Sequence, residues 1–188
     1  MRRRGNTCLA LPAAVILAVT APSARSTCPL PALRSALETP RPGDLYLRAG
    51  RATCTSLEID VVAHGVEGLF TVAFDLHYPA ALLKFEGHAP GPLLRRGAPR
   101  TPPLFLVRGP APGQIQVSMT RFAPDGAVAA AGSETLITLR FTRIAGGSDR
   151  IDFALDPGSP VAERIVDDEG RTVSARFGPG HGGSATIP

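Results

Sequence analysis

The sequence predicts an all-β protein, a jelly-roll β-sandwich of about nine strands. Apolar and polar residues alternate over several short segments, glycine and proline separate those segments, and no long segment has the apolar period of a helix. A sandwich requires such alternation, because every second side chain of a strand must point into the core that the two sheets share.

The first long strand is predicted over residues 57–63, where apolar side chains fall on one face and mostly polar ones on the other. The inward set is Leu57, Ile59, Val61 and Ala63, and the outward set is Glu58, Asp60, Val62 and His64. Residues 64–68 contain Gly65 and Gly68 and are expected to form a turn.

The second strand is predicted over residues 69–78, with Phe70, Val72, Phe74, Leu76 and Tyr78 inward and Thr71, Ala73, Asp75 and His77 outward. Pro79 ends this strand because proline cannot donate to a sheet ladder, and residues 83–85 begin a third. The alternation leaves open whether residues 55–63 and 69–78 pair as a hairpin or lie in different sheets.

Shorter strands complete the predicted sandwich. They are expected at residues 45–47, 104–108, 114–121, 134–143, 150–156, 163–166, 172–176 and 184–187. Three of them repeat inward apolar residues at period two, namely Ile115, Val117 and Met119, then Ile137, Leu139 and Phe141, then Ile151, Phe153 and Leu155. Residues 27–43 are expected to be an N-terminal arm and linker, with a helical turn or two at residues 32–38.

Residues 1–26 have the pattern of a signal peptide. Arg2, Arg3 and Arg4 precede an apolar run at residues 9–19, which is too short for a membrane span of about 20 residues. Ala24-Arg25-Ser26 suits cleavage, so we expect a bacterial protein that is secreted, periplasmic or extracellular. Without these residues the formal charge of +4 falls to zero, which argues against a nucleic-acid surface.

Two of the three cysteines remain after cleavage, Cys28 and Cys54. Paired cysteines are common in exported chains, and a disulfide between these two would close a loop of about 27 residues, stabilising the fold by roughly 3 kcal/mol. Two unrelated thiols or an intermolecular link are the alternatives.

The strand motifs resemble those of the cohesin domain, the dockerin receptor of bacterial polysaccharide-degrading assemblies. The resemblance covers residues 44–187. It rests on residues 65–69 (GVEGL), His77-Tyr78-Pro79, Leu83-Lys84-Phe85, residues 113–118 (GQIQVS), 135–141 (TLITLRF) and 182–187 (GGSATI). It implies that residues 44–188 form one cohesin-like domain, that the two long strands lie in different sheets, and that the second belongs to the partner-binding sheet.

By this resemblance, the outward residues of two strands are the candidate partner-binding site. They are Thr71, Ala73, Asp75, His77, Gln116, Ser118 and Thr120. Asp75 and His77 are expected to be exposed and not needed for folding. The chain has neither residue of the Asn-x-Asp pair that familiar dockerin receptors carry at the positions matching Thr71 and Ala73. A merely solvated sheet face is the alternative.

Enzymatic and metal-binding patterns are weak. The four histidines lie on separate segments without metal-ligand spacing, and Ser118, which with Asp75 and His77 could be drawn as a hydrolase triad, lacks the elbow motif that exposes a nucleophile. Residues 167–170 are acidic but favour a hairpin turn over a calcium loop. We therefore expect no catalytic residues, no metal and no cofactor.

Direct polysaccharide binding is the main alternative to a protein partner, because some carbohydrate-binding modules share the cohesin sandwich. Modules that grip cellulose or chitin stack sugar rings on a flat row of aromatic side chains. This chain has no Trp, two Tyr and eight Phe, of which four Phe fall at inward positions and most of the others lie in patterns that could equally be core, so few rings remain for a platform. The sequence therefore favours a dockerin-like protein module over a polysaccharide as the partner.

Overall fold

The computed structural model describes residues 32–35, 39–144, 151–156, 165–173, 175–177 and 183–186, with the backbone alone for residues 32–35, 156, 176 and 183–186. The predicted signal peptide, residues 1–26, lies outside the described residues. No helix among the described residues is long and apolar enough to cross a membrane.

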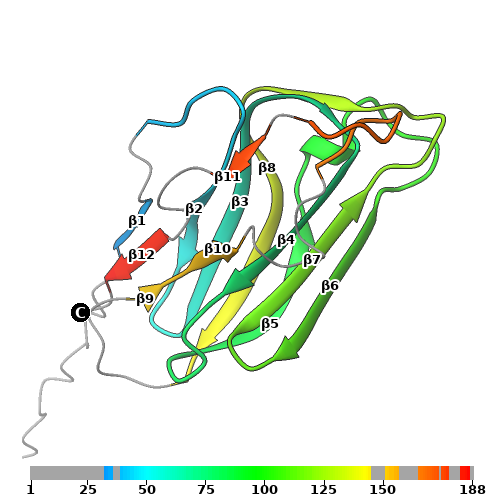
Figure 1. Ribbon diagram of the computed structural model, residues 1–188. Coiled ribbons are helices and arrows are strands. Elements are labelled where there is room, and N and C mark those ends of the chain that lie inside the picture. The colour runs from blue at the N-terminus through cyan, green and yellow to red at the C-terminus, as the bar shows by residue number, and fades with distance from the viewer. Residues whose placement is uncertain are drawn as a thin grey trace, which may run out of the picture.

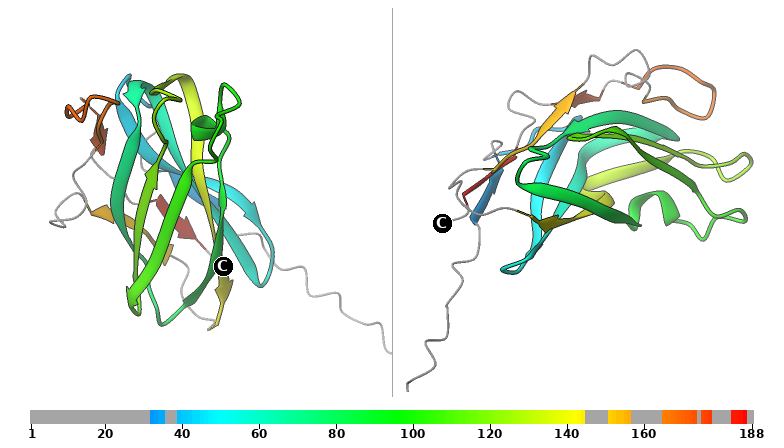
Figure 2. Two further views of the ribbon diagram at one scale, coloured as in Figure 1. Left: turned by 90° about the vertical axis from the view of Figure 1, so that its right-hand side faces the viewer. Right: turned by 90° about the horizontal axis from the view of Figure 1, so that it is seen from below.

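The architecture is the predicted all-β sandwich of two facing sheets (Figure 1). One sheet has the order β11-β2-β3-β8-β5, with β2 (Asp44–Ala52), β3 (Ser56–Leu69), β5 (Leu83–Pro90), β8 (Val128–Arg143) and β11 (Arg176–Phe177). The other has the order β10-β4-β7-β6, with β4 (Thr71–His77), β6 (Leu104–Ala111), β7 (Gln114–Thr120) and β10 (Ala154–Asp156). The end-on view in Figure 2 shows the two layers and the short η1 turn (Leu93–Arg95) beside them.

The core is the layer of inward side chains between these sheets. All nine residues of the three period-two stripes predicted after residue 114 are buried in it. The Phe141 ring lies at its centre, with ring centroids 5.1 Å from Tyr78, 5.3 Å from Phe153 and 5.7 Å from Phe85. Tilted contacts of this kind add to the stabilisation that burial alone provides.

The chain crosses from one sheet to the other between β3 and β4, as the cohesin resemblance implied. The turn expected at residues 64–68 is wrong, because β3 continues through it to Leu69. Gly65 and Gly68 have φ values of 56° and 70°, so they absorb the register shifts that let the strand run on. The chain turns at Phe70 instead, where the backbone N–H donates to Val166 O at 3.0 Å.

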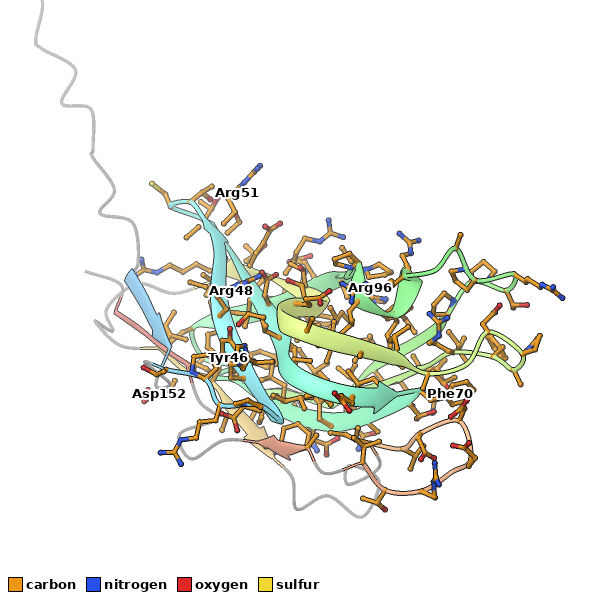
Figure 3. The ribbon with its side chains drawn as sticks, turned by 90° about the horizontal axis from the view of Figure 1, so that it is seen from above. Tyr46, Arg48, Arg51, Phe70, Arg96 and Asp152 are labelled. Atoms are coloured by element: carbon orange, nitrogen blue, oxygen red, sulfur yellow. The ribbon has the colours of Figure 1, made fainter. Side chains whose placement is uncertain are left out.

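For two residues, the predicted inward or outward position does not match their burial in the structure. Leu69 is fully buried in the core, whereas Phe70, predicted inward, is half-buried at the end of β3 (Figure 3). Val62, predicted outward, is also buried, and it lies in register with Tyr46 of β2 outside the core cluster. Alternation gives the face of a strand but does not say whether that face is covered.

The ends of the chain differ most from expectation. Residues 32–35 form β1 (Ala32–Ser35) rather than helix, paired antiparallel with β12 (Gly183–Thr186). β12 also pairs with β9 (Ile151–Asp152), so the predicted closing strand belongs to a third, small sheet. In the five-stranded sheet, β11 is the strand that pairs with β2 in the parallel direction. Pairing between segments distant in sequence has overridden the local helix propensity of the arm.

The later predicted strands are also more fragmented than expected. The described part of the strand expected at residues 150–156 forms β9 and β10, separated by the buried Phe153, because β9 pairs with β12 while β10 pairs with β4. The strands expected at residues 163–166 and 172–176 contribute the isolated bridge between Val166 and Thr172 and part of β11.

The predicted disulfide stays a prediction. Cys54 lies on the turn between β2 and β3, where its thiol is exposed and free. Cys28, the expected partner, lies outside the described residues.

A buried arginine joins two loops at one end of the sandwich. The Arg121 guanidinium donates to the backbone carbonyls of Gly126 at 2.7 Å, Asp125 at 2.9 Å, Arg96 at 3.1 Å and Leu94. The loop that follows β7 is thereby bound to the segment that leads into β6. Arg121 thus helps to fix β6 and β7 relative to each other.

Asp125 adds a second link between the same loops. Its carboxylate accepts hydrogen bonds from the backbone N–H of Arg100 at 2.9 Å and of Thr101 at 3.3 Å. The hydrogen bond from Arg100 lowers the pKa of Asp125 most, and the bond from Thr101 lowers it further. Together they outweigh the loss of solvation, which alone would raise the pKa, and they hold it below its ordinary value of 3.8.

Replacing Phe74 by Ala is expected to lower the free energy of unfolding by about 3 to 5 kcal/mol, because a core cavity replaces the ring. Phe74 is 1% exposed and its ring lies 6.4 Å from that of Phe177. Phe122→Ala is the matched control. Its ring is 38% exposed, so a change within about 0.5 kcal/mol is expected in urea unfolding. Equal losses from both variants would mean that the core has been misplaced.

Titration of Asp125 is expected to loosen the loop before β6 only at strongly acidic pH. A lowered pKa means that the carboxylate stabilises the fold fully above 3.8 and loses this effect as the pH falls through the lower folded-state value. The NMR amide shifts of Arg100 and Thr101 should therefore titrate with a midpoint below 3.8, and should not do so in Asp125→Asn. A midpoint at or above the ordinary value would contradict the two hydrogen bonds.

Candidate functional site

The outer face of the four-stranded sheet carries all seven predicted site residues. They form cross-strand rows between β4 and β7, in which Thr71 lies opposite Thr120, Ala73 opposite Ser118, Asp75 opposite Gln116 and His77 opposite Gln114. The hydroxyl oxygens of Thr71 and Thr120 are 2.7 Å apart. The structure thus brings these residues together on one surface, which we call the β4–β7 face.

Strand β6 extends this face with residues that the sequence analysis did not assign to the site. Leu104, Leu106 and Arg108 lie opposite Thr120, Ser118 and Gln116. Leu104 is 41% exposed and Leu106 is 43% exposed. The signal was present in the sequence, because Leu104 and Leu106 alternate with the partly buried Phe105 and Val107. A strand that is apolar on both faces must expose one of them when only one side meets the core.

A hollow of about 280 Å³ lies on the β4–β7 face. Its lining residues are Phe74, Asp75, Leu106, Arg108, Gln116, Val117 and Ser118. The hollow is bordered by apolar and polar groups together, a combination that suits recognition better than a uniformly hydrated strand surface does.

Asp75 corrects one expectation about this surface. It was expected to be exposed, but it is only 2% exposed. Its carboxylate Oδ2 accepts a hydrogen bond from Gln114 Nε2 at 3.0 Å. β4 lies between β10 and β7, so the Asp75 side chain is flanked on both sides. His77, the other residue expected to be exposed, is half-buried.

The hydrolase triad considered in the sequence analysis is not assembled. Ser118 lies opposite Ala73, while His77 lies opposite Gln114, four residues further along β7. At about 3.3 Å per residue these rows are roughly 13 Å apart, far beyond the reach of a nucleophile and its base. His64 does lie 2.8 Å from Ser133 Oγ, but on the other sheet.

The outer face of the five-stranded sheet has a different electrostatic character, because several of its charged groups pair with one another. Arg48 donates to Asp60 at 3.0 Å and to Thr135 at 2.8 Å, and Thr138 donates to Asp60 at 2.6 Å. Arg96 pairs with Glu134. Arg48 and Arg96 both lie on this side of the sandwich (Figure 3).

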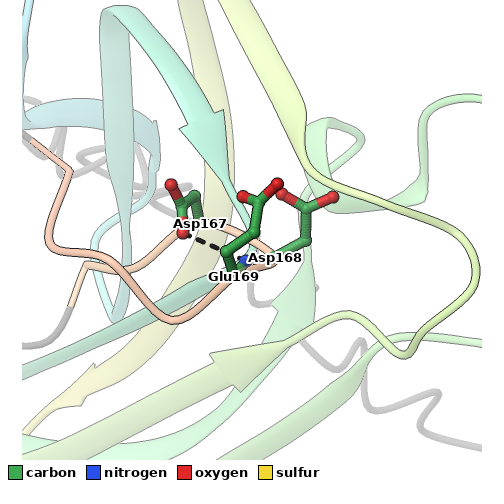
Figure 4. Close-up of side chains that lie close together, drawn as sticks. All are labelled: Asp167, Asp168 and Glu169. Carbon is green, nitrogen blue, oxygen red and sulfur yellow. Dashed lines mark hydrogen bonds between the residues drawn. The ribbon is translucent and has the colours of Figure 1, made fainter.

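The acidic loop at residues 167–169 gathers three carboxylates within 4.8 Å of one another (Figure 4). Asp167 is already occupied, because it accepts from Arg171 Nε at 2.7 Å and from the backbone N–H of Arg171 at 2.8 Å. Partial burial alone would raise the pKa of Asp167, but the contacts with Arg171 lower it. This arrangement fits the hairpin turn that the sequence favoured.

Comparisons with known proteins place the fold. No protein-family profile matches the chain, and no curated protein matches it. Three similar solved structures are cohesins. The solution structure of CaCohA2 from Clostridium acetobutylicum has 15% identity and a TM-score of 0.59, covering 78% of this chain and 92% of that one. A non-cellulosomal cohesin from the archaeon Archaeoglobus fulgidus has 17% identity, a TM-score of 0.51 and coverages of 71% and 86%.

The third structure is a type I cohesin–dockerin complex from Clostridium thermocellum, with 12% identity, a TM-score of 0.55 and coverages of 75% and 95%. These similarities cover 71% to 78% of this chain at low sequence identity, so they establish architecture. The chain has the fold of a cohesin domain.

Proposed function

We propose that this chain is an exported, non-catalytic binding module, and that a protein module of the dockerin type docks on its β4–β7 face. The observation that carries the proposal is the composition of that face. The exposed Leu106 lines a hollow together with polar side chains of all three strands, and the exposed Leu104 lies two residues before it on β6. Interfaces commonly combine an apolar contact area with placed polar groups on a rigid scaffold.

The fold supports a protein as the partner class. The Clostridium thermocellum structure is that of a cohesin bound to a dockerin. By analogy, the role proposed here belongs to extracellular polysaccharide degradation or surface assembly. Export rests on the pattern of residues 1–26, and the partner on the fold and on the face.

A flat aromatic platform for glycans is missing from the described part of the β4–β7 face. The rings of Tyr78 and Phe85 pack on Phe141, and Phe105 packs against the core. Phe122 is exposed, but it follows β7 in a loop. Stacking on sugar rings therefore has little support, and a protein partner is the better proposal.

Capture from culture supernatant tests the proposal. Ser118→Arg places a long charged side chain in the hollow and is expected to abolish capture of the partner. Ser133→Arg makes the same change on the outer side of the five-stranded sheet and is expected to bind as wild type. Melting curves of both variants check that they are folded. Loss of capture in Ser133→Arg, with retention in Ser118→Arg, would assign the partner to the other sheet.

A sedimentation assay with insoluble cellulose and chitin is run beside the capture. The proposal expects the wild-type protein to remain in solution. Retention on either polysaccharide, with no protein captured, would reverse the choice of partner class.

The intact mass of the secreted protein tests export and the disulfide together. We expect a chain that begins after residue 26, with a mass about 2 Da below that of the fully reduced form because Cys28 and Cys54 are joined. An uncleaved N-terminus would contradict export. Two alkylatable thiols would leave Cys54 free, as it is in the structure.

A further inference from the structure

The hollow on the β4–β7 face contains a carboxylate that is buried without a cationic partner among the described residues. Asp75 is 2% exposed, and its hydrogen-bond donor in the described chain is the neutral Gln114 side chain. The carboxylates of Asp60, Glu134 and Asp167, by contrast, each contact an arginine. Burying a charge is costly unless an opposite charge compensates it.

The surroundings of Asp75 define what such a compensating group must be. Leu106, 43% exposed, provides an apolar wall, while Gln116 and Ser118 provide polar groups on the adjoining strand. An aliphatic stem ending in an ammonium group matches both features, because the stem covers the leucine while the charged end reaches the carboxylate.

We propose that the hollow is a subsite for a lysine side chain of the protein partner, whose ammonium group pairs with the Asp75 carboxylate. This inference rests on the proposed function, because it names the chemistry by which the partner is held on the β4–β7 face. Asp75 lies one row beyond the pair of positions, Thr71 and Ala73, to which the cohesin resemblance drew attention.

Arg108 fixes the direction of approach. It lies opposite Gln116, two strands from Asp75, at about 9 to 10 Å by the usual strand spacing. Its exposed positive charge disfavours a cation at the β6 side of the hollow and leaves Asp75 as the favourable end. An anionic ligand would meet the opposite arrangement, with the buried carboxylate against it.

The test uses Nα-acetyl-lysine methylamide as the probe and the neutral norleucine derivative, which has the same aliphatic stem, as its control. Each is titrated into the millimolar range while the NMR amide signals of Gln116 and Ser118 are followed. The affinity of the lysine probe, obtained from the shifts of both signals, is expected to be at least tenfold higher than that of the norleucine probe. Only the lysine probe can donate a hydrogen bond from a charged group to the Asp75 carboxylate. Equal binding of the two probes, or tighter binding of Nα-acetyl-glutamate methylamide, would overturn the proposal.

Two carboxylate variants identify the residue responsible. Asp75→Asn keeps the shape and the bond from Gln114 but removes the charge, so about a tenfold or larger loss of lysine-probe affinity is expected. Its melting temperature should equal or exceed that of the wild type, because an uncompensated buried charge is removed. Asp60→Asn, on the other sheet, is expected to leave probe binding unchanged. Wild-type affinity in Asp75→Asn would overturn the assignment.

A third variant keeps Asp75 in place. Gln116→Lys introduces an ammonium group directly opposite Asp75, so it should occupy the carboxylate from within the chain, raise the melting temperature and abolish binding of the lysine probe. Undiminished probe binding in this variant would contradict the subsite.

The capture assay separates this proposal from the proposed function. If Ser118→Arg abolishes capture while Asp75→Asn captures as wild type, the result supports the docking face and contradicts the lysine subsite. If Ser118→Arg captures as wild type, the docking face itself is wrong, whatever the probe shows.

Discussion

The structure depends on one layer of apolar side chains that two sheets bury between them. β3 supplies this layer from one sheet and β4 from the other, although only Phe70 separates the two strands in the sequence. The crossing at Phe70 is therefore the constraint that places β4 beside β7 rather than beside β3. Its backbone is held on both sides, because Phe70 N donates to Val166 O and Arg121 N donates to Phe70 O, both at 3.0 Å.

The crossing also creates the candidate site. It turns the outward residues of β4 toward those of β7 and β6 and gives the sandwich two unlike outer faces. On the five-stranded sheet, Arg48, Asp60 and Thr138 satisfy one another. On the β4–β7 face, Leu106 is exposed and Asp75 lacks an ionic partner among the described residues. A partner gains the most binding free energy where the protein leaves apolar surface exposed and a charge unpaired. Such a surface lowers the stability of the unbound protein.

Local pattern predicted the sandwich and the shared face well, because period-two alternation directly reflects which side of a strand meets the core. Ile115, Val117 and Met119 are buried as expected. The local sequence pattern gave wrong predictions where the conformation of a segment depends on pairing with segments distant in the sequence. Gly65 and Gly68 suggested a turn but act as bulges within a continuous strand, and the arm at residues 32–35 pairs with residues 183–186. The burial of Asp75 likewise depends on the strands packed on either side of it, which no local alternation specifies.

The central claim, that a protein partner covers the β4–β7 face, is tested most directly by hydroxyl-radical footprinting of the free and partner-bound protein. The account predicts that oxidation of Leu104 and Leu106 falls on binding. Ile144, which is 55% exposed and follows β8 of the other sheet, should be oxidised to the same extent in both states. Unchanged oxidation of both leucines in a verified complex would contradict the account.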